Sequence, residues 1–251
     1  MDSHELAGKV AIVTGAGRNI GRAIALTLAE GGASILVNAR SNRAEADAVA
    51  HEIESAGGKA LVHIGDVADA KSVQAMADAA VKQFGRIDIL VNNAALRREK
   101  SFAEMSYAEW REIMDVTLDG TFHCVKACLP ALRQSGGGTI VNIGGLSAHT
   151  GAKNRAHVVT AKAGIIGFTR ALAHDLAEDG ITVNCVVPGL IGTPRPKGSA
   201  EPAHHLTHGT ITGERGRPED VAAAVRFLCG PGARYVNGQA IHANGGAYLG
   251  A

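Results

Sequence analysis

Short apolar runs alternate with amphipathic stretches along most of this chain. The apolar runs are rich in Val, Ile and Leu, and between them apolar residues return at helical spacing. The pattern predicts strands at 10–13, 35–37, 61–63, 87–91, 139–143 and 181–187, and crossover helices at 20–29, 45–54, 72–84 and 161–176.

The strand pattern also predicts how the sheet is covered. Strands that are apolar throughout, rather than at alternate positions, are typical of a parallel sheet with helices on both faces. We therefore expect an α/β fold, a doubly wound parallel sheet of the Rossmann type. No linker divides the chain, so residues 1–251 are expected to form a single domain, with the irregular, proline-containing stretch 192–216 as a mobile lid over the substrate.

Composition narrows the classes of partner. The 251 residues carry a net charge of +1, which gives no electrostatic reason to expect nucleic acid or a membrane surface. No apolar run approaches the roughly 18 residues that span a bilayer. Residues 1–9 lack the apolar stretch of a secretory signal, so we expect a cytoplasmic protein. The four cysteines lack the spacing of a zinc site and are expected to be reduced.

A glycine-rich turn, TGAGRNIG at 14–21, lies between the first predicted strand and the first predicted helix. Small residues let backbone amides approach a pyrophosphate, and the helix N-terminus adds partial positive charge. This context predicts a dinucleotide-binding site, and a tight turn without a ligand is the alternative.

From about Lys9 to the NGG segment at 244–246, the chain resembles the short-chain dehydrogenase/reductase family. Besides the glycine turn it has NNAA at 92–95, a lysine at the YxxxK position and a Pro-Gly turn at 188–189. Its general pattern resembles bacterial 3-oxoacyl-carrier-protein reductases. The resemblance implies a nicotinamide dinucleotide bound by Thr14, Gly15, Gly17, Arg18, Asn19, Ile20, Gly21, Arg40, Asp66, Val67, Asn93, Ala94, Lys162, Pro188, Gly189 and Thr193.

Three departures from the family pattern bear on the cofactor. Asn19 replaces a glycine, which we expect to be tolerated because Asn enters the left-handed region more readily than most residues. Ala95 ends the NNAG-like segment and adds only a methyl group. Ala39 stands where an acidic residue would bind the adenosine ribose, and Arg40 follows it. Arg40 and Arg18 are suited to clamp a 2′-phosphate, so NADP(H) is favoured over NAD(H).

The resemblance also implies a catalytic serine, tyrosine, asparagine and lysine, of which only Lys162 is present. Gly145, Val158 and Thr117 stand at the serine, tyrosine and asparagine positions. A positioned general acid contributes about 10²–10⁴ in rate, and one oxyanion donor about 10²–10³. We therefore expect ordinary ketone reduction to be severely slowed, with Lys162 retained to order the ribose.

Two neighbouring side chains are candidate substitutes. Ser147, on an extended backbone, would face the same way as Gly145 but about 6–7 Å farther along. His157 adjoins Val158 at a helix start, where one residue is about a 100° turn, so it should point away. Packing or exposure is the simpler expectation for both. Tyr248 would enter a neighbouring site only through an assembly of chains.

Basic residues gather on loops expected around the cleft. They predict an anionic substrate, such as a carboxylate, a phosphate or an acyl carrier, or else a solvated basic rim. The residues are Arg97, Arg98, Lys100, Lys153, Arg155, Arg195 and Lys197. The HHLTH segment at 204–208 lacks a completing ligand, so no metal is expected.

Three functions remain open. The first is an NADP(H)-dependent oxidoreductase with an atypical active site. The second is an inactive cofactor-binding subunit, paired with an active paralogue, or a nucleotide sensor. The third is a non-redox lyase, isomerase or hydrolase that uses His149, His157 or Ser147 in the same cleft. The resemblance also implies a homo-oligomer, a dimer or tetramer, with the Lys162 helix at an interface.

Overall fold

The computed structural model describes residues 4–193 and 209–250. Within them one seven-stranded parallel sheet has the order β3-β2-β1-β4-β5-β6-β7. The strands are β1 (Val10–Val13), β2 (Ser34–Ala39), β3 (Ala60–Ile64), β4 (Ile89–Asn92), β5 (Gly138–Ile143), β6 (Ile181–Pro188) and β7 (Ala240–Ala243). The predicted doubly wound α/β fold is confirmed, and the strand order reverses between β1 and β4, where such sheets bind ligands.

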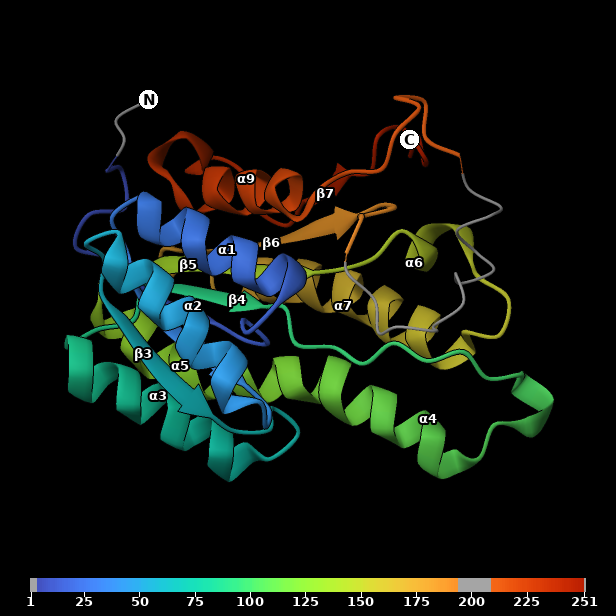
Figure 1. Ribbon diagram of the computed structural model, residues 1–251, viewed down its shortest axis with the longest axis horizontal. Coiled ribbons are helices and arrows are strands. Elements are labelled where there is room, and N and C mark those ends of the chain that lie inside the picture. The colour runs from blue at the N-terminus through green and yellow to red at the C-terminus, as the bar shows by residue number, and fades with distance from the viewer. Residues whose placement is uncertain (1–3, 194–208, 251) are drawn as a thin grey trace.

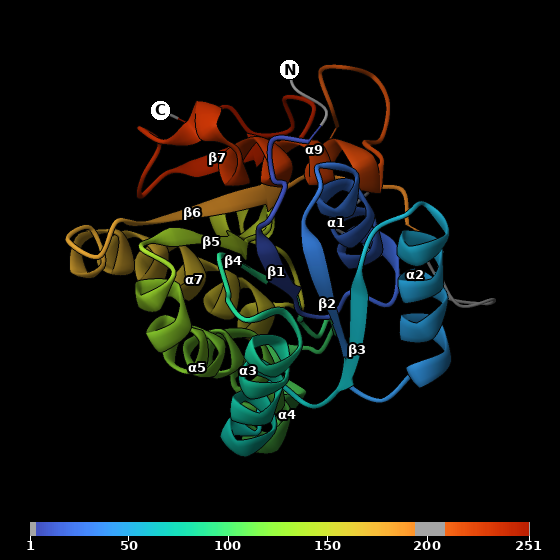
Figure 2. The same cartoon turned by 90° about the vertical axis from the view of Figure 1, so that its left-hand side faces the viewer.

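Helices cover both faces of the sheet (Figures 1 and 2). One face carries α1 (Asn19–Glu30), α2 (Arg43–Ser55) and α9 (Pro218–Cys229), and the other carries α3 (Ala70–Phe84), α5 (Gly120–Gln134) and α7 (Ala156–Asp175). Shorter elements are α4 (Tyr107–Met114), α6 (Ser147–Thr150), the 3-10 turns η1 (Phe102–Glu104) and η3 (Pro231–Ala233), and the π-helical turn η2 (Asp115–Asp119). α4 packs beside α7.

Alternate strand residues supply two separate cores. Val13 and Val37 are buried in the cluster that includes α1 and α9, whereas Ile12, Leu36 and Leu90 are buried in the cluster that includes α3 and α5. The sheet is therefore apolar on both faces, which is why its strands have no polar alternation. In the part of the chain that the structure describes, no helix has the length and apolar character needed to cross a membrane.

Some elements depart from the prediction. β7, α4, α5 and α9 were not predicted, and β4 begins two residues later than expected because buried Asp88 precedes it and accepts a hydrogen bond from the Val10 amide at 3.0 Å. All four cysteines are free thiols, and Cys124 and Cys128 are buried on α5. Of the predicted lid, residues 194–208 lie outside the described residues, and with them Arg195, Lys197, His204, His205 and His208.

Candidate active site

The turn between β1 and α1 takes the conformation that its sequence permits. Gly15 has a φ of 62°, and Asn19 has a φ of 51°, in the left-handed region where a glycine was replaced. A Cβ on Gly21 would come within 2.2 Å of the Gly15 carbonyl oxygen, so only glycine fits there. Arg18 precedes α1 and provides no side-chain cap. The first amides of α1 are therefore left to face an anion.

Thr14 and Asn93 fasten this turn to the end of β4. The Thr14 hydroxyl accepts hydrogen bonds from the amides of Asn93 and Ala94 at 3.0 and 3.1 Å. The Asn93 side chain donates to the carbonyl oxygens of Thr14 and Gly15 at 2.9 and 3.0 Å. These bonds hold the turn in place, so Thr14 and Asn93 position the site through the backbone.

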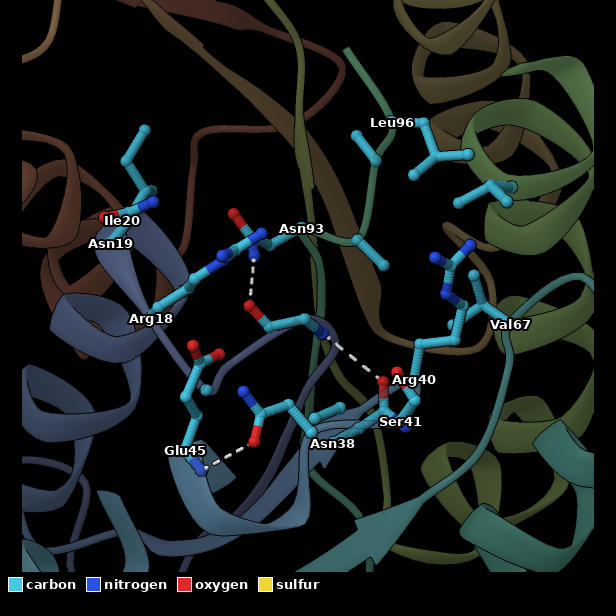
Figure 3. Close-up of a pocket in the computed structure, with 18 of the residues that line it drawn as sticks. Arg18, Asn19, Ile20, Asn38, Arg40, Ser41, Glu45, Val67, Asn93 and Leu96 are labelled. Carbon is cyan, nitrogen blue, oxygen red and sulfur yellow. Dashed lines mark hydrogen bonds between the residues drawn. The ribbon is translucent and has the colours of Figure 1, made fainter. Parts of the chain in front are cut away.

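A cavity of about 470 Å³ extends from the glycine turn across the ends of β2 and β4 (Figure 3). Arg18 and Arg40 lie on opposite sides of it, and Ala39, at the end of β2, lines it where an acidic residue would bind the ribose. Glu45, from the first turn of α2, also lines the cavity and was missed by sequence reasoning. The predicted cofactor residues that line it are Gly15, Gly17, Arg18, Asn19, Ile20, Gly21, Arg40, Asp66, Val67, Asn93, Ala94 and Thr193.

The Pro-Gly turn lies farther along the same edge of the sheet. Pro188 ends β6, and its carbonyl oxygen accepts a hydrogen bond from the Leu146 amide at 3.1 Å. The Gly189 amide donates to Ala243 at 2.9 Å, and a Cβ on Gly189 would come within 2.6 Å of Asn244. The turn thus joins the segment after β5 to the segment after β7.

Lys162 is buried on α7, with 8% of its surface exposed. Its Nζ donates a hydrogen bond to the carbonyl oxygen of Ile143, at the end of β5, at 2.5 Å. Burial lowers the pKa of Lys162 to about 8, helped by the positive charges of Arg97 and Arg155 and opposed by Cys185. The amine therefore loses its proton more readily than an exposed lysine does, although the charged form still predominates at neutral pH.

The three positions at which the expected catalytic side chains are missing have different surroundings. Among the described residues, a Cβ on Gly145 would have one non-adjacent neighbour within 4 Å, Lys162 Cγ at 3.7 Å, so a Cβ fits there. Val158 is 4% exposed and packs in an apolar cluster with Ile113. Thr117 lies in the π-helical turn η2, and its buried hydroxyl oxygen has no hydrogen-bond partner among the described residues. No acid stands at the predicted tyrosine position.

The two candidate substitutes are placed differently from each other. The expectation of an extended backbone at Ser147 was wrong, because Leu146 is already helical and Ser147 begins α6. His157 is 1% exposed, and burial lowers its pKa. The positive charges of Arg155 and Arg98 lower the pKa further, whereas the Arg155 backbone and the Glu109 carboxylate raise it. The buried Nδ1 of His157 has no hydrogen-bond partner in the described part of the chain. These surroundings give His157 a packing position beside α4.

A cluster of three rings was missed by sequence reasoning. The ring centroids of His149 and His242 are 4.6 Å apart, and that of Tyr248 lies 5.0 and 5.2 Å from them. Tyr248 thus contacts side chains of its own chain. Burial lowers the pKa of both histidines, with Arg170 adding to the effect on His149 and His149 to that on His242. Within the described residues, no group of three or more His, Cys, Asp or Glu side chains could hold a metal ion.

Sequence and structure comparisons place the chain in a family. A family model described as Enoyl-(Acyl carrier protein) reductase matches residues 15–248. With the sheet order and the glycine turn, this shows that the chain belongs to the short-chain dehydrogenase/reductase family.

Individual relatives agree with that assignment. The 3-oxoacyl-[acyl-carrier-protein] reductase FabG of Staphylococcus aureus (strain Mu50 / ATCC 700699) is 39% identical over 242 residues, covering 96% of this chain and 98% of the relative. The protein of the same name from Vibrio cholerae is 39% identical over 245 residues, covering 97% and 99%. A dehydrogenase/reductase from Sinorhizobium meliloti 1021 superposes with a TM-score of 0.92 at 34% identity, covering 98% of each chain.

Proposed function

We propose that this chain is an NADP(H)-dependent oxidoreductase whose active site lacks the usual proton donor. The observation that carries the proposal is the placement of Lys162. It is buried at the carboxyl edge of the sheet beside the open position of Gly145, as a ribose-ordering lysine should be. The glycine turn at the same edge supplies the amides for a pyrophosphate.

Arg18 and Arg40 support the phosphate-bearing form of the cofactor. Both line the cavity at the end of β2, where Ala39 cannot accept hydrogen bonds from ribose hydroxyls. Guanidinium groups pair readily with a 2′-phosphate. Glu45 lines the same cavity and opposes this preference, so discrimination between NADPH and NADH is expected to be moderate.

The dinucleotide supplies the hydride when it is bound. Lys162 then orients the ribose and places positive charge near the oxygen that becomes an alkoxide. Val158 has no group that can donate a proton to that oxygen, so the proton comes from water. The reaction is therefore limited by charge stabilisation, and neutral ketones are poor substrates.

Binding and turnover test the proposal together. NADPH and NADH should be titrated by fluorescence, and carbonyl reduction should be followed by loss of absorbance of the reduced cofactor. NADPH binding with slow but measurable reduction is expected. Failure to bind either dinucleotide would overturn the assignment.

The second candidate is an inactive subunit or sensor. Burial of Val158 among apolar side chains favours it, because a residue packed in this way has a structural use of its own. Copurification of a homologous chain with an intact catalytic set, together with NADPH binding and no turnover, would favour this candidate.

The third candidate, a non-redox enzyme, has weaker support. A hydrolase would need a nucleophile paired with a base, and Ser147 makes no side-chain hydrogen bond to a histidine among the described residues. Turnover of a substrate without any dinucleotide would favour this candidate.

A further inference from the structure

Arg97 differs from the other basic residues around the cleft. It lies five residues after the end of β4 and, like its chain neighbour Leu96, lines the cavity. The next residue, Arg98, is engaged elsewhere, since its Nη2 lies 2.7 Å from a carboxylate oxygen of Glu112. Arg97 makes no ion pair or hydrogen bond through its side chain within residues 4–193 and 209–250. Its guanidinium is therefore available to a ligand.

Arg97 is accessible to solvent, but protein atoms surround much of its side chain. The residue is exposed, but the surrounding protein desolvates the guanidinium and lowers its pKa. A side chain in a concave wall meets both conditions, because solvent reaches it from one side only. This places Arg97 in the cleft, whereas a solvated rim would leave its charge fully hydrated.

Arg97 also adds to the positive charge at Lys162. After burial, Arg97 is the largest cause that lowers the pKa of Lys162, and it lowers the pKa of Arg155 too. Among the described residues no carboxylate contributes at Lys162, and the Cys185 thiol opposes the shift. Like charges repel each other in a partly desolvated cleft, and a bound anion would relieve that repulsion.

We propose that Arg97 binds the carboxylate of a small oxo acid or hydroxy acid, whose reacting carbon lies between Arg97 and Lys162. The proposal rests on the oxidoreductase function proposed above and names its substrate class. A carboxylate is favoured because one guanidinium fork matches its two oxygens and leaves Lys162 for the carbonyl oxygen. In the reduction, the hydride forms the new C–H bond, the carbonyl π pair moves to oxygen, and that oxygen takes a proton from water.

The site also explains how a missing acid is tolerated. An alkoxide that forms between two positive charges needs less help from a proton donor than one that forms beside neutral groups. Val158 and Gly145 are then compatible with turnover of an anionic substrate, although neutral ketones react slowly.

Arg97→Leu and Arg97→Lys test the proposal, with Arg98→Leu as the matched control. Each protein is assayed with NADPH and pairs of 2-oxo and 3-oxo acids and their methyl esters. The wild type should prefer an acid to its ester in kcat/KM. Arg97→Leu should raise KM for the acid about 10- to 100-fold, as expected for the loss of a charge-assisted pair, and remove the preference. Arg97→Lys should keep part of the preference for the acid, and Arg98→Leu should keep all of it.

Two results would overturn the carboxylate site, and a third would separate this proposal from the proposed oxidoreductase function. Equal wild-type activity on acid and ester would overturn the carboxylate site. So would an Arg97→Leu variant whose main defect is weaker NADPH binding, since Arg97 would then belong to the cofactor. If the wild type reduces nothing, the oxidoreductase proposal fails, and calorimetry of an oxo acid and its ester with the NADPH-loaded protein still decides the site. Binding of the acid but not of the ester, lost in Arg97→Leu, supports the carboxylate site. Equal binding of acid and ester, or no binding of the acid, overturns the carboxylate site.

Discussion

Gly145 and Lys162 lie side by side: a Cβ added to Gly145 would lie 3.7 Å from Lys162 Cγ, with no other non-adjacent atom of the described residues within 4 Å. The missing serine has thus left space, whereas Val158 is packed in an apolar cluster. The two losses have different structural consequences. A serine Cβ can be returned without displacing a described neighbour, whereas a larger ring at 158 must share space with Ile113 and Trp110.

Lys162→Met should separate cofactor binding from stability. Removal of the ammonium should weaken NADPH binding about 10- to 100-fold, because a charge-assisted bond to the ribose is lost. The free energy of unfolding should change little, because removal of a buried charge is stabilising and loss of the hydrogen bond to Ile143 is destabilising. Fluorescence titration and thermal unfolding measure the two effects. A variant that binds NADPH as tightly as the wild type contradicts the ribose-ordering role.

Arg40→Asp should convert the cofactor preference. A carboxylate at the end of β2 repels a 2′-phosphate and accepts hydrogen bonds from ribose hydroxyls, so the NADPH-to-NADH ratio of kcat/KM should fall at least about tenfold. Arg22→Ala is the control, because Arg22 pairs with Glu52 on the surface. An unchanged ratio in Arg40→Asp would show that Arg40 lies outside the phosphate site.

The left-handed conformation of Asn19 in the glycine turn can be tested by measuring the stability of Asn19 variants. Its φ of 51° should make Asn19→Ala destabilising by about 1 kcal/mol, whereas Asn19→Gly should be neutral or stabilising. Chemical denaturation measures the difference. Asn154, with a φ of 60° outside the cavity lining, is the control: its variants should show the same stability pattern without changing NADPH affinity.

The ring cluster predicts a loss of stability in mild acid. Because the pKa of His149 and of His242 is lowered in the folded state, the unfolded chain binds more protons as pH falls below about 6.5, and the free energy of unfolding falls with it. The loss is complete below the folded-state pKa values. A His149→Phe/His242→Phe variant should lose less thermal stability between pH 7.5 and 5.5 than the wild type does.

The control for the ring cluster is His51→Gln, which removes an exposed imidazole from α2. It should keep the wild-type pH dependence. Some dependence should remain in the double variant, because burial also lowers the pKa of His63 and His157. A double variant with the full wild-type loss would rule out the ring cluster as a source of acid sensitivity.

The fold was predictable because its information is local. Each central strand contains a short apolar run, and the glycine turn needs conformations that its own residues determine, as Gly21 and Asn19 show. β7 was missed because its four residues include a histidine and are only half buried.

Parts of the candidate site were less predictable because they depend on contacts between distant segments. His149 meets Tyr248 across most of the C-terminal half of the chain, and Arg97 acts on Lys162 from another strand end. The helical turn at Leu146 redirected Ser147 without a clear sequence signal.

The proposed active site binds the dinucleotide and lacks the hydroxyl groups that would bind the substrate oxygen and protonate it. Gly145→Ser/Val158→Tyr tests this directly against Gly145→Ala/Val158→Phe, which adds comparable bulk without hydroxyl groups. The measurement is single-turnover hydride transfer from NADPH to a neutral ketone, with NADPH affinity determined for each protein. We predict similar affinities and a rate at least about 10²-fold higher with the hydroxyls than without them. Equal rates in the two double variants, with NADPH bound in both, would contradict the account.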